Sequence, residues 1–300
     1  MKLSVLIATK NRQINIIKLL NSIAVSFYKP YEIVIVSSGE NITLAVKMFQ
    51  DQLNIVHEHV EIENQVYQKK IGLSKLSKDS DWVMFCDDDM EFSPETISQI
   101  LKCCINLDPK ILGIGINLRS DFNKISKPNS IRKILFKPGH IKKWGATNSY
   151  FKVEERIETS WLNGISLWQT SIVKLYNPKL INFNYAAYED VFFSYKVSKI
   201  GKLVYEPSIK INLQNPQNQD TDTVKNFIAL TVNRIAFVRQ NKEFSILGLY
   251  LYELSRLLKV VLSKTIRKKE KVRFLLKVLC NFKNFQELDN QAVEKFDKPS

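Results

Sequence analysis

Short apolar runs alternate with helical segments through the first 118 residues, and this alternation constrains the fold more than any other feature of the chain. The runs are rich in β-branched and aromatic residues, which is typical of strands buried on both faces. Strands that alternate with helices form a mostly parallel, doubly wound α/β sheet. We expect strands at 3–8, 33–36, 53–56, 82–86 and 111–118, with helices at 16–24, 40–49, 64–76 and 93–107.

The pattern weakens at 119–158 into a segment with Lys, Ser and Pro, which indicates a variable insertion. Order resumes at 161–168, where Gly164 suggests that a ligand or another backbone comes close. A helix is expected at 191–200, and a strand at 202–205 that Pro207 closes. The α/β pattern therefore covers residues 1–215.

The strand at 82–86 ends in three consecutive carboxylates, Asp87, Asp88 and Asp89. Adjacent carboxylates raise one another's pKa unless a cation lies among them. Residues i and i+2 of an extended backbone point to the same side, so Asp87 and Asp89 are expected to face one site while Asp88 faces away. Ligands of open α/β sheets bind beyond the carboxyl ends of the strands. The triplet indicates a site where Mn²⁺ or Mg²⁺ meets a substrate diphosphate; the alternative is a solvated acidic turn.

The net charge of +14 implies an anionic partner, which is nucleic acid, an anionic membrane surface or a phosphorylated substrate. The four cysteines have no CxxC spacing, which argues against a zinc site and fits a reducing, cytoplasmic compartment. The start of the chain is too short before Lys10 to be a signal peptide. No run reaches the roughly 20 apolar residues that a membrane span needs.

From residue 221 onward the pattern is helical only, at 224–239 and 244–264. A basic stretch with helical apolar spacing follows at 264–279. Such a helix is typical either of a solvated face packed on its own domain or of a membrane surface. We therefore expect a basic helical extension at 216–300, with an anionic membrane surface as one partner.

Five segments, in order along the chain, resemble the inverting glycosyltransferases of family 2, which have the GT-A fold. They are similar to the family's opening strand and nucleotide-side loop, its basic helix near the donor, its DxD metal motif, its acceptor-side glycine segment and its ED motif. The segments are 4–12, 68–73, 87–89, 161–164 and 188–190. The resemblance extends to residue 213 and implies a GT-A domain followed by the helical extension.

The resemblance also implies roles for single residues. Asp89 would coordinate the metal on the donor diphosphate, Asp87 would hold both the nucleotide ribose and the metal, and Asp190 would be the catalytic base. The remaining implied donor-binding residues are Thr9, Asn11, Arg12, Ser37, Ser38, Lys69 and Asp88, and the acceptor-binding residues are Trp161, Gly164 and Glu189. The alternative for Glu189 and Asp190 is that they complement the dipole at a helix N-terminus.

Two departures from the family pattern stand out. Many members have an Asp after the second strand, where this chain has Ser37 and Ser38, so the nucleotide stays open. Many also have a His after the last strand of the sheet, where this chain has Asn212-Leu213-Gln214. The three histidines lie elsewhere, and we expect them to be ordinary surface or strand residues; they are His57, His59 and His140.

The predicted function is metal-dependent transfer of a sugar from a nucleoside-diphosphate sugar to a hydroxyl of a glycan or lipid-linked acceptor, in cell-surface polysaccharide synthesis. The metal would stabilise the leaving diphosphate, and a carboxylate would deprotonate the acceptor as it attacks. We expect this at the inner face of the cell membrane. Alternatives are nucleotidyl transfer, which lacks its Gly-rich loop here, an inactive homologue, and a nucleic-acid binder. Nucleic acid is not expected, because the basic residues form no recognisable DNA or RNA motif.

Overall fold

The computed structural model describes residues 1–105, 107–119, 137–149, 153–178, 180, 186–214 and 224–282. The chain divides into two compact units. The first comprises Met1–His140, Asn148–Pro178 and Asp190–Asn218, and the second comprises Ile141–Thr147, Lys179–Glu189 and Gln219–Ser300. Much of the insertion expected at 119–158 lies outside the described residues, namely 120–136 and 150–152.

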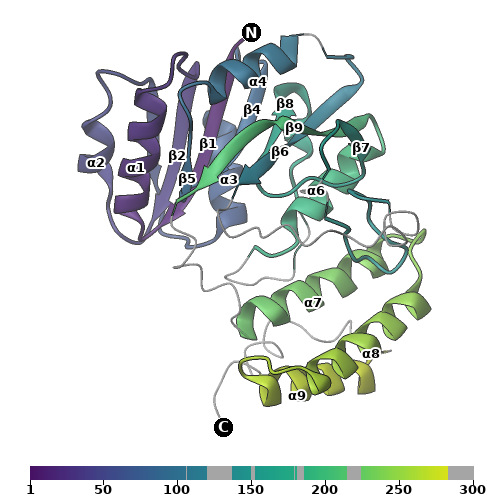
Figure 1. Cartoon of the computed structure of the whole chain (residues 1–300). Helices are drawn as coiled ribbons and strands as arrows, with labels where there is room; N and C mark the ends of the chain where they lie inside the picture. Colours follow the sequence, from purple (N-terminus) through teal and green to yellow (C-terminus); the bar gives the residue numbers. More distant parts are fainter. Residues whose placement is uncertain are drawn as a thin grey trace. The chain divides into compact units, whose positions relative to one another are not determined.

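The first unit is built on a nine-stranded sheet within the described residues (Figure 1). Hydrogen-bonded neighbours follow the order β3-β2-β1-β4-β8-β6-β9-β5, and β7 pairs with β9 beside this path. The strands are β1 Leu3–Lys10, β2 Glu32–Ser38, β3 Ile55–His59, β4 Trp82–Asp87, β5 Met90–Glu91, β6 Ile111–Arg119, β7 Ile157–Thr159, β8 Ser166–Gln169 and β9 Lys202–Leu213.

The sheet is parallel on one side and mixed on the other. Strands β3, β2, β1 and β4 run parallel, as the alternation of strands and helices predicts. Strand β8 then runs antiparallel to both β4 and β6, while β6 and β9 are parallel. The parallel strands bring their carboxyl ends to one edge, where Thr9 pairs with Ser37 and Ala8 with Asp87.

Helices cover both faces of this sheet. On one face, α1 (Gln13–Ala24), α2 (Thr43–Lys47) and α4 (Thr96–Ile105) share one hydrophobic core with Val5 and Ile7 of β1. On the other face, α3 (Gln65–Lys75) places Gly72 against Leu6, so closely that an added Cβ would lie 2.1 Å from its Cδ1. The sheet is doubly wound because helices cover both of its faces. Alternate residues of β1 point to opposite faces and so contact both layers of helices.

The helix α6 (Glu189–Ser198) and the 3₁₀ helix η1 (Thr170–Leu175) complete the first unit. Phe193 of α6 stacks on Phe85 of β4 with ring centroids 6.1 Å apart. Phe85 is paired in register with Leu6, so α6 lies on the same face of the sheet as α3. This stack holds the start of α6 close to the end of β4.

Two predicted strands differ from the structure. The third strand is Ile55–His59 rather than 53–56, because Leu53 belongs to the turns that follow α2 and donates its N–H to Phe49. The prediction that Pro207 ends a strand is wrong, since β9 continues to Leu213. A register shift against β6 lies at this proline, and a bulge tolerates a residue that has no N–H to donate.

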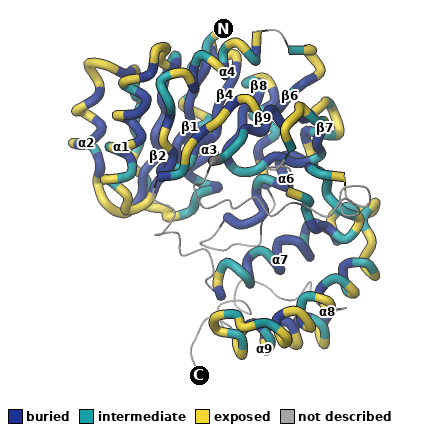
Figure 2. Tube along the Cα trace, viewed as in Figure 1, coloured by how far each residue is buried: buried dark blue, intermediate teal, exposed yellow. Residues whose placement is uncertain are grey.

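The second unit holds three helices within the described residues, α7 Val224–Gln240, α8 Ile246–Leu262 and α9 Lys268–Cys280. Ser245 caps α8 by accepting a hydrogen bond from Gly248 N at 2.9 Å. Glu253 is completely buried and accepts from Arg234 at 2.9 Å and from Arg256 at 2.6 Å. Figure 2 shows that α7 is largely buried while much of α8 and α9 is exposed. No described helix is both long and apolar enough to cross a membrane.

Candidate active site

The acidic triplet lies at the carboxyl end of β4 and is held by the turn that follows β1. Thr9 Oγ1 donates to Asp88 Oδ2 at 2.6 Å, and Arg12 Nη1 donates to Asp88 Oδ1 at 2.8 Å. The same Arg12 nitrogen lies 3.7 Å from Asp89 Oδ2. One guanidinium therefore neutralises part of the charge of two carboxylates.

The acidic triplet is not one continuous extended segment. The prediction that Asp87 and Asp89 face one site while Asp88 faces away assumed an extended backbone, which the structure does not have here. Strand β4 ends at Asp87, and Asp88 and Asp89 form a turn. Asp88 is buried and points to Thr9 and Arg12, while Asp87 Oδ1 accepts a hydrogen bond from Gln65 Nε2 at 3.4 Å. Asp88 thus has the surroundings of a residue that fixes the turn.

Burial and charge act against each other at Asp88. Burial raises the pKa of its carboxyl group, and the hydrogen bonds and charge of Thr9 and Arg12 partly oppose that rise. The negative charge of Asp88 in turn raises the pKa of Arg12, so the guanidinium stays protonated. The Arg12 side chain is 48% exposed, which leaves its cationic group accessible from solvent.

Gln68 of α3 ties the ends of β1 and β2 together. Its Nε2 donates to Thr9 O at 2.7 Å and to Val36 O at 3.0 Å, and it lies 3.3 Å from Ser38 Oγ. Gln68 belongs to the segment 68–73 of the family resemblance, but we gave it no role from the sequence. A polar residue on the buried face of a helix could have indicated that it bonds to a neighbouring element. The next residue, Lys69, is also buried, with its Nζ 5.2 Å from the centre of the Phe85 ring.

The turns after β1 and β2 interlock through Asn11. This residue has a left-handed backbone with φ of 53°, and its Oδ1 accepts from Glu40 N at 2.7 Å. Gly39 is also left-handed, and a Cβ at this position would lie 2.1 Å from Asn11 Oδ1. Asn11 therefore fixes the shape of the two loops that border the triplet.

Ser37 contacts both histidines of β3. Its hydroxyl lies 2.9 Å from His57 Nε2 and 3.0 Å from His59 Nδ1. Burial, together with the neighbouring His59, lowers the pKa of His57. Both histidines are strand residues, and both contact the Ser37 hydroxyl near the carboxyl end of β2.

The residues expected at the acceptor side lie around the start of α6. Asp190 Oδ1 accepts a hydrogen bond from Val191 N at 2.8 Å, and Trp161 Nε1 donates to Asn148 O at 3.2 Å. Ser194 of α6 accepts from Leu162 N at 2.9 Å, which ties the segment 161–164 to the helix that begins beside Asp190. Glu189 precedes Asp190 and is buried.

Gly164 has a different environment from the one expected for contact with another backbone. Among the described residues, no atom beyond its two chain neighbours lies within 4 Å of a Cβ added there. Contact with another described backbone segment therefore does not explain this glycine.

A divalent cation is compatible with the residues at the triplet. Within the described residues, no three His, Cys, Asp or Glu side chains are grouped as a closed metal site would need. Asp87 and Asp89 carry carboxylate oxygens, the type of ligand that Mg²⁺ and Mn²⁺ prefer, and a bound diphosphate would complete such a site. Two carboxylates without a third protein ligand among the described residues suit a metal that binds together with its substrate.

The model of the glycosyl transferase family 2 matches residues 4–153, which is half of the chain. The chain belongs to this family. This membership confirms the resemblance found in the sequence and the prediction of a glycosyltransferase. A glycosyltransferase of Bacillus subtilis (strain 168), YwdF, whose description calls it uncharacterized, is 34% identical over 103 residues. That match covers 34% of this chain and 38% of YwdF.

Solved structures confirm the GT-A fold of this family 2 chain. Staphylococcus aureus TarS 1-349, in complex with UDP-GlcNAc, has a TM-score of 0.55 at 15% identity, over 99% of this chain and 78% of TarS 1-349. The mannosyltransferase PcManGT of Pyrobaculum calidifontis, in complex with GDP-Man and Mn²⁺, has a TM-score of 0.57 at 13% identity. The match covers 94% of this chain and 75% of PcManGT.

Gln214 received no role from the sequence. It belongs to the segment Asn212-Leu213-Gln214, which stands where the resemblance would place a His. Its backbone N donates to Asp89 O at 2.6 Å, and its Nε2 donates to Met90 O at 2.6 Å and to Asn15 O at 3.3 Å. Its Oε1 is buried without a hydrogen-bond partner among the described residues. Gln214 therefore supports the acidic turn from the side of β9.

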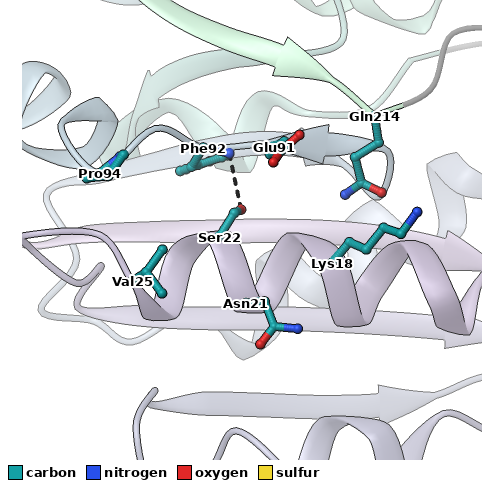
Figure 3. A pocket seen from close by; sticks show the side chains of 8 residues that line it. All are labelled: Lys18, Asn21, Ser22, Val25, Glu91, Phe92, Pro94 and Gln214. Atoms are coloured by element: carbon teal, nitrogen blue, oxygen red, sulfur yellow. Dashed lines mark hydrogen bonds between the residues drawn. The ribbon is translucent and has the colours of Figure 1, made fainter.

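An open pocket of about 660 Å³ lies between α1 and the β5 segment (Figure 3). Figure 3 shows Lys18 and Gln214 toward one end of it and Val25 and Pro94 toward the other, with Phe92 N bonded to Ser22 Oγ at 3.1 Å. None of the predicted site residues lines this pocket. Gln214 lines the pocket and also donates a hydrogen bond to the acidic turn.

Proposed function

We propose that this protein transfers a sugar from a nucleoside-diphosphate sugar to a hydroxyl group of a glycan or lipid-linked acceptor, with inversion at the anomeric carbon, in cell-surface polysaccharide synthesis. The observation that carries the proposal is the acidic turn after β4, which Thr9 and Arg12 hold from one side and Gln214 from the other. The ligands of TarS, UDP-GlcNAc, and of PcManGT, GDP-Man with Mn²⁺, support a nucleotide-sugar donor.

Asp87 and Asp89 would hold Mn²⁺ or Mg²⁺ against the donor diphosphate. The bound metal would stabilise the negative charge of the departing nucleoside diphosphate. Arg12 adds a fixed, half-exposed positive charge at the same place, and we assign it to the diphosphate as well. Asn11, Ser37, Ser38 and Lys69 shape the donor edge, since each is engaged within the protein.

Asp190 would take the proton of the acceptor hydroxyl. The N-terminus of α6 and the N–H of Val191 stabilise its ionised form, which is the form that accepts a proton. The acceptor oxygen then bonds to the anomeric carbon, and the bond from that carbon to the diphosphate oxygen breaks. Trp161, Gly164 and Glu189 belong to the segments that we assign to the acceptor, and the absence of contacts from other described residues beside Gly164 fits this role.

A thermal-shift panel tests the donor part of the proposal. UDP-, GDP- and dTDP-sugars are added to the full chain with and without Mn²⁺, beside the variants Asp89→Ala and Glu95→Ala. Glu95 is an exposed acid and serves as the control for the loss of one negative charge. A donor at about 100 times its Kd stabilises the folded state by about 2.7 kcal/mol.

The expected result is a metal-dependent shift for one nucleotide, which Glu95→Ala keeps and Asp89→Ala loses. A shift that survives in Asp89→Ala would contradict the assignment of the metal. No shift with any donor would contradict the proposed activity and favour a catalytically inactive homologue.

A further inference from the structure

Helix α8 has two apolar faces, and the structure buries only one of them. Leu249, Leu257 and Val260 are buried together with Glu253. The second face is exposed, with exposed fractions between 36% and 86%. We call it the leucine stripe; its members are Leu247, Leu251, Leu254, Leu258, Val261 and Leu262.

The leucine stripe is continuous along the helix. The first five members follow one another at intervals of three and four residues, which places them on one side of an α-helix, and Leu262 comes directly after Val261. None of the six is charged. Ile266, after the end of α8, and Leu276 of α9 are further exposed apolar residues, at 69% and 47%. Contiguous apolar surface of this kind is uncommon on a protein that stays surrounded by water.

The helices around the stripe are strongly cationic. Residues 224–282 contain thirteen Lys and Arg against three Glu and no Asp. The single fully buried carboxylate among these, Glu253, is already bonded to Arg234 and Arg256. The exposed cations lie on α8, on α9 and between them, and they are Lys259, Lys264, Arg267, Lys269, Arg273 and Lys277.

The charge decides which partner fits the stripe. The spacing alone would also suit a helix of a second copy of the chain. Two copies joined there would bring two cationic surfaces together, and like charges oppose such contact. A bilayer with anionic lipids offers an apolar layer for the leucines and negative headgroups for the lysines and arginines.

We propose that the leucine stripe of α8 binds the interface of an anionic lipid bilayer, with the cations of α8 and α9 on the headgroups. From the sequence, the basic stretch at 264–279 is open between a solvated face and a membrane surface; the structure places the exposed apolar stripe on α8. The inference goes beyond sugar transfer and stands apart from it, because lipid binding is measured without donor, metal or acceptor.

Vesicle flotation with the full chain tests the inference. The vesicles contain either phosphatidylcholine alone or phosphatidylcholine with about one third phosphatidylglycerol, a composition that supplies the anionic surface the cations require. The apolar variant is Leu251→Gln with Leu258→Gln. Its matched control is Leu44→Gln with Met48→Gln, since both are exposed apolar residues, Leu44 on α2 at 78% and Met48 at the C-cap of α2 at 68%. The charge variant is Lys269→Gln with Arg273→Gln.

The wild type and the matched control are expected to float with anionic vesicles and to bind pure phosphatidylcholine weakly. The apolar variant should bind at least tenfold more weakly, because each buried leucine contributes on the order of tenfold or more. The charge variant should lose about fivefold per cation removed. Unchanged thermal unfolding establishes that each variant is folded.

Three results would overturn the inference. One is a wild type that does not float with anionic vesicles. Another is an apolar variant that floats as well as the wild type, since charge alone would then account for the binding and the leucine stripe would not contribute. The third is a wild-type dimer in sedimentation equilibrium that is absent in the apolar variant, since the leucine stripe would then be a contact between two copies of the chain.

Discussion

The backbone N–H of Gln214 donates a hydrogen bond to the carbonyl oxygen of Asp89 at 2.6 Å, and so fastens the end of β9 to the acidic turn that follows β4. The side chain of Gln214 adds hydrogen bonds from Nε2 to Met90 O and to Asn15 O. A residue 124 positions away from Met90 therefore fixes the backbone beside the proposed metal ligands. We assign Gln214 as a positioning residue for that turn.

Replacing Gln214 with Ala should weaken the turn. The buried carbonyl group of Met90 loses the side-chain donor of Gln214, and an unsatisfied buried acceptor costs about 1–3 kcal/mol. We expect a lower free energy of unfolding in urea and a smaller metal-dependent thermal shift with the donor. Gln99→Ala, at an exposed position on α4, should change stability by less than about 0.5 kcal/mol. Equal behaviour of the two variants would rule out a positioning role.

Arg12 and Asp88 should be energetically coupled. Arg12→Ala leaves the buried Asp88 carboxylate with Thr9 as its remaining hydrogen-bond partner among the described residues, whereas Asp88→Asn removes the charge itself. Because half of the Arg12 side chain is exposed, solvent reduces the effect, and we expect a loss of about 1–2 kcal/mol for Arg12→Ala. A double-mutant cycle by urea denaturation should show that the two changes together cost less than their sum. Strict additivity would mean that the ion pair contributes nothing.

The carboxyl edge of the parallel strands is the part of the site that the sequence predicts well. Buried runs that end in Thr9, Ser37 and Asp87 place these residues together, because parallel strands end at one edge. Gln68 and Gln214 could not be found in this way, since their roles depend on contacts with residues 59 and 124 positions away. The course of β9 past Pro207 likewise depends on its register with β6.

His57 should make stability depend on pH. Its pKa in the folded state lies below the ordinary value of 6.5 because of burial and the neighbouring His59. The unfolded state therefore binds the proton more readily, so His57 contributes stability above pH 6.5 that is lost as pH falls through its folded pKa. Urea denaturation between pH 7.5 and 5.5 should show a shallower decline for His57→Gln than for the wild type. His140, whose pKa burial also lowers, is present in both proteins, so the difference isolates His57.

Glu253 should be essential to the helical unit. It is fully buried between Arg234 and Arg256, so Glu253→Gln leaves two largely buried guanidinium groups without a carboxylate. Breaking a buried ion pair from one side costs about 3–5 kcal/mol. Glu270→Gln breaks an exposed pair with Arg267 and should cost less than about 1 kcal/mol. Similar unfolding midpoints for the two variants would contradict this ranking.

Electron paramagnetic resonance can follow the binding of Mn²⁺ to the acidic turn after β4. Free Mn²⁺ is titrated against the wild type, Asp89→Ala and the control Glu95→Ala, with and without the nucleoside diphosphate that the donor panel identifies. We expect tight Mn²⁺ binding when protein and nucleotide are both present, weakened at least tenfold in Asp89→Ala and unchanged in Glu95→Ala. Nucleotide-dependent binding of equal strength in Asp89→Ala and in the wild type would contradict the claim that the acidic turn after β4 holds the metal and the donor diphosphate.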